Sequence, residues 1–264
     1  MRRIFIFGLG YTAARAARAL ETQGWEVVST GRSGTLRFDD ESNVRLALAD
    51  SHHVLSSVPP DGAGFDPVLE SYGDALRDKH LVYLSSTGVY GDTGGAWVDE
   101  SAPTGTGRRT ARAEADRLWL ERGARVLRLP GIYGPGRSAL ERVESGAARR
   151  IDLANQIFSR VHVDDIASAA LLALEAPAGA YNVADDLPTS QNTVIEHACH
   201  LLGLPWPELQ AIEEAGLSPM ARAFYAENRR VANRKAKRVL GWAPRFPTYR
   251  EGLAALFAAR QRDQ

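Results

Sequence analysis

Two glycines placed close behind a short apolar run constrain the fold more than any other feature of the chain. Residues 4–7 read Ile-Phe-Ile-Phe, and Gly8, Gly10 and Ala13 follow in the run Gly-Leu-Gly-Tyr-Thr-Ala. This spacing predicts a strand, a tight turn at Gly8 and a helix that packs on the strand through the small Ala13, while Gly10 lets a pyrophosphate approach the backbone. The chain is therefore expected to begin with a dinucleotide-binding βαβ unit.

The first helix is expected to begin at Tyr11 and Thr12, where its free backbone amides and its dipole favour bound phosphate. The second expected strand ends near Thr30, Arg32 and Ser33, where a fold that binds NAD would place an acidic residue. A guanidinium beside two hydroxyls suits a 2′-phosphate instead, so NADP(H) is predicted in preference to NAD(H). The alternative is that Arg32 is one of many surface arginines.

Short β-rich runs alternate with longer amphipathic segments over the first 183 residues. Strands are predicted at 4–7, 26–30, 53–58, 81–85, 125–129 and 180–183, and helices at 11–23, 67–77, 109–122 and 164–174. This alternation predicts an α/β fold with a doubly wound parallel sheet of the Rossmann type and a smaller, mostly helical C-terminal substrate subdomain. Residues 1–134 and 160–184 are assigned to the first domain, and residues 135–159 and 185–264 to the second.

The balance of charges limits the classes of partner that the chain is expected to bind. The chain has 32 basic and 32 acidic residues, a formal net charge of zero, and a hydrophobic content of 44%. Neither nucleic acid nor a membrane surface is an expected partner of a chain with that balance. The lone Cys199 excludes an internal disulfide, and the first apolar run is too short for a signal peptide, so a cytoplasmic protein is expected.

Four segments resemble signatures of one family. Residues 84–91 read Leu-Ser-Ser-Thr-Gly-Val-Tyr-Gly, 128–136 contain Tyr-Gly-Pro-Gly, 161–167 contain Val-His-Val-Asp-Asp, and 240–253 contain Leu-Gly-Trp and Glu-Gly-Leu. Together they resemble the extended short-chain dehydrogenases/reductases, which include NAD-dependent epimerases and dehydratases, in the atypical branch that the glycine spacing indicates. The resemblance implies a small-molecule substrate, often a nucleotide sugar, and a homodimer.

The resemblance also implies roles for single residues. Ser86 matches the residue that orients the substrate, and Thr87 could replace it. The remaining matches belong to the cofactor site. The segment that would lie along the nicotinamide contains Pro130, Ile132 and Tyr133, and the turn that would flank the adenosine ribose contains Ser56, Val58 and Pro59.

The family's catalytic Tyr-x-x-x-Lys pair is missing, because none of the eight tyrosines has a lysine four residues later. Arg108 and Arg112 stand where the pair is expected. Arginine can hold an anion but cannot give up a proton, so Arg108 cannot replace the tyrosine, whereas Arg112 could replace the lysine as a donor. Alternatively, both lie on a solvated helix face, with Arg112 paired to Asp116. Tyr90 and His162 are the remaining titratable candidates, although each could be a packed core residue.

Two classes of function follow. The first is an NADP-dependent oxidoreductase, epimerase or dehydratase acting on a sugar-like substrate, and the second is a non-catalytic NADP(H)-binding redox sensor or regulatory protein. Arginines flank the expected cleft and could favour an anionic substrate: Arg137, Arg149, Arg150 and Arg160. No metal site is expected, because the Glu-His-x-Cys-His run at 196–200 lacks a second pair of ligands.

Overall fold

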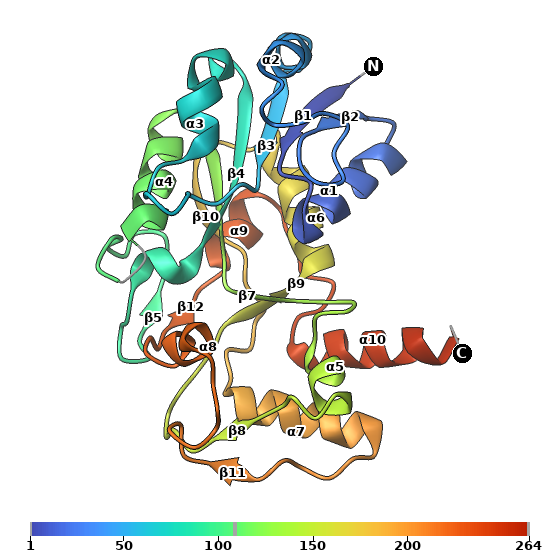
Figure 1. The fold of residues 1–264 in the computed structure, drawn as a ribbon, viewed down its shortest axis with the longest axis vertical. Coiled ribbons are helices and arrows are strands. Elements are labelled where there is room, and N and C mark those ends of the chain that lie inside the picture. The colour runs from blue at the N-terminus through green and yellow to red at the C-terminus, as the bar shows by residue number, and fades with distance from the viewer. Residues whose placement is uncertain (1, 108–109, 263–264) are drawn as a thin grey trace.

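A six-stranded parallel sheet forms the centre of the computed structural model, which describes residues 2–107 and 110–262 apart from the Met220 side chain. Its strands run downward in Figure 1, in the order β10-β6-β4-β3-β1-β2. Their bounds are Arg3–Phe7 (β1), Glu26–Ser29 (β2), His53–Ser56 (β3), His80–Ser86 (β4), Arg125–Leu129 (β6) and Gly179–Asn182 (β10). The predicted doubly wound Rossmann fold class is confirmed.

Helices cover both faces of the sheet because its strands are apolar on both. In β1, Ile4 and Ile6 face one core and Phe5 and Phe7 face the other. The first core is closed by α1 (Tyr11–Thr22) and α6 (Val163–Ala173), and the second by α2 (Glu41–Ala49), α3 (Pro67–Tyr72) and α4 (Thr110–Glu121). Such continuous apolar strands are typical of parallel sheets.

The C-terminal part contributes to the sheet's own core. Ala236 of α9 (Arg234–Val239), Leu240 and Trp242 are buried in the cluster that α1 and α6 close. The Trp242 indole Nε1 donates a hydrogen bond of 3.0 Å to the Asp165 backbone oxygen at the start of α6. Part of the segment expected in the second subdomain therefore packs with the first.

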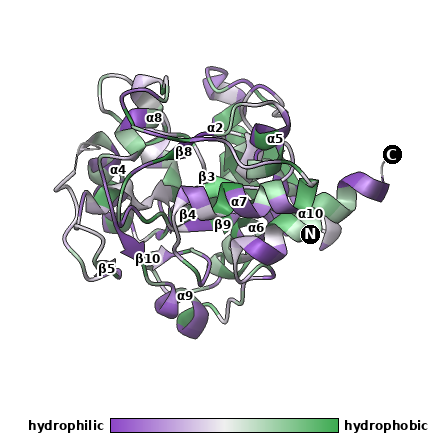
Figure 2. Cartoon of the chain, turned by 90° about the horizontal axis from the view of Figure 1, so that it is seen from below, coloured by the Kyte–Doolittle hydropathy of each residue, from purple (hydrophilic) through white to green (hydrophobic). Residues whose placement is uncertain are grey.

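Below the carboxyl ends of the strands lies a smaller, mainly helical region (Figure 1). It contains α5 (Ala139–Glu144), α7 (Gln191–Leu202), α8 (Pro219–Phe224) and α10 (Tyr249–Arg262), and a separate cluster of buried side chains joins α5, α7 and α10. In Figure 2, α10 is hydrophobic where it meets α7 and hydrophilic toward its C-terminal end. Among the described helices, none has the length and apolarity needed to cross a bilayer.

Short elements complete the chain. The described residues include the 3-10 helices η1 (Gly73–Leu76) and η2 (Thr87–Tyr90). Three pairs of very short parallel strands connect distant segments: β5 (Trp97–Val98) with β12 (Arg230–Val231), β7 (Gly131–Tyr133) with β9 (Arg160–His162), and β8 (Arg150–Ile151) with β11 (Leu209–Gln210).

Candidate functional site

The site lies where the strand order reverses. The chain leaves β1 toward β2 on one side and returns to β3 on the other, so the carboxyl ends of β1 and β3 lie next to each other, with Phe7 paired to Ser56. In open parallel sheets, ligands bind outside the carboxyl ends of the strands at this point.

The turn after β1 is fixed from three sides. Gly8 has a φ of +79°, and a Cβ there would lie 2.9 Å from Val58 Cγ2. Leu9 N donates to Thr30 O at 2.7 Å, and Ser57 Oγ donates to Gly8 O at 2.5 Å. Gly8 is therefore required by both conformation and space. Ser57 was missed by sequence reasoning, which selected its neighbours Ser56 and Val58; only the pairing of β3 with β1 places it here.

The N-terminus of α1 is open. Gly10 is the N-cap in an extended conformation. Among the described residues no side chain caps the helix, and a Cβ on Gly10 would meet no heavy atom within 4 Å apart from those of its two chain neighbours. Ala13 is fully buried against the sheet, and the Tyr11 hydroxyl donates to Pro135 O at 3.1 Å. Free amides at Tyr11 and Thr12 with open space before them fit a bound pyrophosphate.

The polar residues at and after the end of β2 differ in burial and in hydrogen bonding. Thr30 is buried, and its Oγ1 accepts a hydrogen bond of 3.3 Å from Gly8 N, so it fastens the turn. Arg32 and Ser33 are exposed, and within the described residues neither has a hydrogen bond or an ion pair. The loop then folds back, because Leu36 N donates to Ser29 O at 3.0 Å. Arg32 and Ser33 thus lie beside the turn as unengaged donors.

The other predicted cofactor residues lie at strand ends. Ser56 is buried at the end of β3, and its Oγ has no hydrogen-bond partner among the described residues, while Pro59 is exposed. Pro130 and Ile132 are half-buried; Pro130 separates β6 from β7, and Ile132 lies within β7. The contacts of these residues with a cofactor stay predictions.

Ser86 ends β4 and is half-buried, and its Oγ accepts a hydrogen bond of 3.1 Å from Gly88 N at the start of η2. In the sheet it pairs with Leu129, directly before Pro130. Thr87, its neighbour, is buried. The parallel register thus places Ser86 next to the segment assigned to the nicotinamide.

A buried polar network holds Tyr90. The Tyr90 hydroxyl donates to Asn182 Oδ1 at 2.7 Å and accepts from Arg128 Nη1 at 2.9 Å, and burial raises the pKa of Tyr90. Asp116 accepts two hydrogen bonds from Arg128, at 2.7 and 3.1 Å, and one from Ser85. The Tyr90 hydroxyl is buried, and its hydrogen bonds are already made within the protein, so it is a poor proton donor to a substrate. This geometry favours the interpretation of Tyr90 as a packed core residue.

Arg112 does not pair with Asp116, which corrects the predicted helix-surface ion pair. Asp116 is buried against Arg128, and Arg112 instead donates to the Tyr83 hydroxyl at 2.8 Å. The 3.6-residue period of the helix places Arg112 and Asp116 near each other, but Asp116 faces the sheet and pairs there with the buried guanidinium of Arg128. Arg108 lies outside the described residues.

Tyr133 and His162 form a second buried group below the sheet. Their rings lie edge to face, with centroids 5.1 Å apart, and neither the Tyr133 hydroxyl nor His162 Nε2 has a partner in the described part of the chain. His162 Nδ1 accepts a hydrogen bond from Asp164 N at 3.2 Å. Burial raises the pKa of Tyr133 and lowers the pKa of His162 to about 4, so both are neutral near pH 7.

The arginines expected to attract an anion are partly occupied. Arg150 forms an ion pair of 2.7 Å with Glu196, Arg149 donates to backbone oxygens, and Arg160 is buried and donates to Thr189 O. Arg137 is exposed and lies over the Tyr11 ring, 5.7 Å from its centroid. Of the four, Arg137 has the geometry to face a ligand beside the turn.

Solved structures share this fold over nearly the whole chain. A conserved protein of unknown function from Silicibacter pomeroyi is 39% identical, with a TM-score of 0.87 over 98% of this chain and 99% of that one. A Methylobacillus flagellatus protein provisionally described as an NAD-dependent epimerase/dehydratase is 25% identical, with a TM-score of 0.78 over 98% and 99%. UDP-glucose 4-epimerase from Thermotoga maritima, solved with UDP-glucose, shares the fold at 18% identity, with a TM-score of 0.77 over 99% of each chain.

Two curated relatives share 28% and 32% of their aligned residues with this chain. Protein YeeZ of Escherichia coli K12 is 28% identical and aligns with 82% of this chain and 89% of its own length. A 3-diazoavenalumate denitrifying reductase from Streptomyces is 32% identical over 60% of this chain and 55% of that protein. No family model matches the sequence.

Proposed function

We propose that this chain, which shares its fold with NAD-dependent epimerases and dehydratases, is an extended short-chain dehydrogenase/reductase-like protein and an NADP(H)-dependent enzyme of the epimerase, dehydratase or reductase kind, acting on a sugar-like small molecule. A nucleotide sugar is the proposed substrate class, since the Thermotoga maritima neighbour was solved with UDP-glucose. The exposed Arg137 supports an anionic substrate.

One observation carries the proposal: in the described part of the chain, the α1 N-terminus has no side-chain cap and faces open space at Gly10, although the turn around it is tightly hydrogen-bonded. Backbone amides of Tyr11 and Thr12 would hold the pyrophosphate, and Ser56 and Val58 would flank the ribose. When bound, the nicotinamide would accept or donate a hydride. Ser86 would orient the substrate by a hydrogen bond from its hydroxyl.

The Gly10→Ala variant tests this site. Apart from its two chain neighbours, the new Cβ meets no described heavy atom within 4 Å, so the unfolding temperature without cofactor should change little. NADP+ affinity should fall at least about tenfold, because the methyl group occupies the approach to the backbone. Isothermal titration calorimetry measures the affinity. Unchanged affinity in Gly10→Ala, or no binding of either nicotinamide dinucleotide to the wild type at millimolar concentration, would contradict the proposal.

The preference for NADP(H) is proposed from Arg32, an unengaged guanidinium beside the turn. NADP+ should raise the unfolding temperature more than NAD+ at equal concentration, since a ligand that binds only the native state stabilises it by mass action. Arg32→Ala should abolish the difference by weakening NADP+ binding alone. Arg37→Ala is the matched control, because Arg37 lies in the same loop but is paired with Asp39 at 2.7 Å. An equal response of wild type to both dinucleotides would rule out the preference.

The second candidate function is a non-catalytic NADP(H)-binding sensor or regulator. The occupied Tyr90 hydroxyl and the missing Tyr-x-x-x-Lys pair favour it, because neither leaves an evident proton donor. Oxidation of NADPH, or exchange of its hydride label, with a panel of nucleotide sugars and carbonyl metabolites separates the two. Turnover with any of them supports the enzyme, and binding without turnover across the panel supports the sensor. A homodimer is proposed as well, and light scattering on the purified chain tests it.

A further inference from the structure

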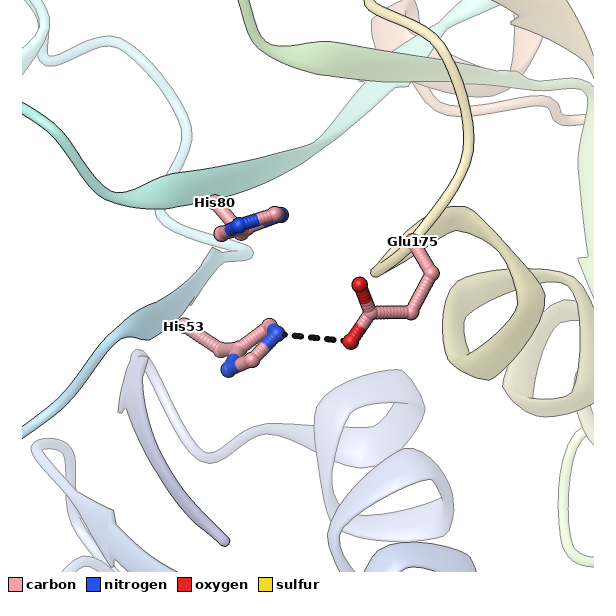
Figure 3. Close-up of side chains that lie close together, drawn as sticks. All are labelled: His53, His80 and Glu175. Atoms are coloured by element: carbon pink, nitrogen blue, oxygen red, sulfur yellow. Dashed lines mark hydrogen bonds and ion pairs between the residues drawn. The ribbon is translucent and has the colours of Figure 1, made fainter.

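Two histidines and a glutamate from three elements converge at the amino-terminal end of the sheet, opposite the cofactor turn (Figure 3). His53 begins β3, His80 begins β4, and Glu175 follows α6. One potential ligand atom from each residue lies within 4.8 Å of the others. Sequence analysis could not find this cluster, because its members lie 27 and 95 residues apart along the chain.

Strand register brings the two imidazoles together. His53 and His80 are direct partners in the parallel pair of β3 and β4, so both side chains leave the same face of the sheet. Their rings stack with centroids 4.8 Å apart, and the Trp25 ring contacts His53 edge on at 4.9 Å. The backbone and the packed indole therefore hold two nitrogen ligands in place.

Hydrogen bonding orients the third partner and fixes one tautomer. His80 Nδ1 lies 3.2 Å from Leu174 O, and since a carbonyl only accepts, Nδ1 carries the hydrogen and Nε2 keeps its lone pair. Histidines that bind metals commonly donate their second N–H to a backbone carbonyl in this way. His53 Nε2 and Glu175 Oε1 face each other at 3.0 Å, so a metal ion that bound here would replace this hydrogen bond with two ligand bonds.

We infer that His53, His80 and Glu175 bind a divalent transition-metal ion, zinc in the first place, which clasps the starts of β3 and β4 to the end of α6. Two imidazoles and one carboxylate are a common zinc ligand set, and magnesium and calcium prefer oxygen ligands. A tetrahedral zinc ion with bonds of about 2.0–2.1 Å separates its ligand atoms by about 3.3 Å. The three ligand atoms already lie within 4.8 Å of one another, and the Glu175 side chain is 61% exposed, so small side-chain movements bring them to this spacing.

This site is independent of the proposed function, since it uses no residue of the cofactor turn. A plain His53–Glu175 ion pair involves one imidazole only, so the contribution of His80 distinguishes the two explanations. Zinc binding should be measured by isothermal titration calorimetry on the untagged full chain after treatment with a chelator, and cobalt absorption spectra should report the coordination geometry.

The variants are His80→Asn, Glu175→Gln and the control His52→Asn, which removes an exposed histidine next to the cluster. Wild type and His52→Asn should bind one zinc ion per chain and gain thermal stability, and the other two should bind at least about tenfold more weakly. Because Glu175 is exposed, Glu175→Gln keeps the test valid if His80→Asn fails to fold. Absence of saturable zinc binding, equal affinity in Glu175→Gln and wild type, or loss of binding in His52→Asn would each overturn the inference.

Discussion

At the scale of single residues, the contact between Gly252 and Tyr133 shows how closely the lower part of the molecule fits the cofactor end. A Cβ built on Gly252 of α10 would press against the Tyr133 hydroxyl and lie 2.7 Å from ring atoms Cζ and Cε2. Tyr133 is buried and belongs to the segment assigned to the nicotinamide. The absence of a side chain at Gly252 therefore lets α10 approach this segment.

Gly252→Ala should lower the free energy of unfolding by about 1–3 kcal/mol, because the methyl group overpacks a buried contact. The sign of this change tests the argument, because alanine at an unconstrained position of a helix would instead raise the free energy of unfolding by about 1 kcal/mol relative to glycine. Urea denaturation measures the change. As a control, Ala254→Gly on the exposed side of α10 should cost only the loss of helix propensity. If Gly252→Ala were more stable than the wild type, the Tyr133 ring would have to shift at little cost, and the close-packing argument would be wrong.

The residues of the turn could be predicted from the sequence because their requirements are local. Gly8 needs a positive φ, and Gly10 needs open space before a helix, and both follow from a few neighbouring letters. Ser57 and the partner of Asp116 could not be predicted, because each depends on which strands lie side by side. The same reason hid the convergence of His53 with His80.

At the scale of elements, the Asp116–Arg128 pair joins α4 to β6 inside the protein. Both side chains are at most 4% exposed and form two hydrogen bonds to each other. Asp116→Ala should lower the free energy of unfolding by about 3–5 kcal/mol, because it leaves a buried guanidinium without its counter-charge. Chemical denaturation measures this cost. Glu114→Ala, which breaks an exposed pair with Arg117 on the same helix, should cost far less, because solvent screens exposed ion pairs.

His162 caps α6 and gives this element a dependence on pH. Burial lowers the pKa of His162 to about 4, whereas an unfolded imidazole titrates near 6.5, so the unfolded chain binds the extra proton between these values. The stability from the neutral ring is complete above about pH 6.5 and is lost as the pH falls toward 4, by up to about 3 kcal/mol.

Unfolding midpoints of wild type and His162→Gln between pH 4 and pH 8 measure this effect. The variant should be less stable at pH 7, because glutamine replaces a packed cap, but its stability should fall less steeply with acid. His200→Gln, at an exposed position, should keep the wild-type slope. The explanation fails if the His162→Gln profile is as steep as that of the wild type.

Periodicity predicted the existence of most elements better than their ends. The helix expected over 67–77 is α-helical only to Tyr72 and continues as the 3-10 helix η1. Helix α2 was not predicted at all, although Asp40 caps it by accepting a hydrogen bond from Asn43 N. Its nine residues are weakly amphipathic, so its place is set by packing of Val44 and Leu48 on the sheet.

At the scale of the whole molecule, the two expected subdomains share a core. Leu240 and Trp242 from the C-terminal part lie in the cluster under α1 and α6, and α10 packs against β9 as well as α7. Heat should therefore unfold the chain in one cooperative transition. Calorimetry and tryptophan fluorescence should give the same midpoint, whereas two separated transitions would show that residues 135–159 and 185–264 form an independent unit.

The loop after β2 has a further consequence. In the described chain, β2 is the outermost strand on its side, and the loop that carries Arg32 and Ser33 doubles back on that strand without adding another. These exposed residues are therefore tethered to the rest of the protein by one strand edge and contribute nothing to either core. Under the role proposed for Arg32, the choice between phosphorylated and unphosphorylated adenosine would therefore depend on residues that can be exchanged while both cores stay intact.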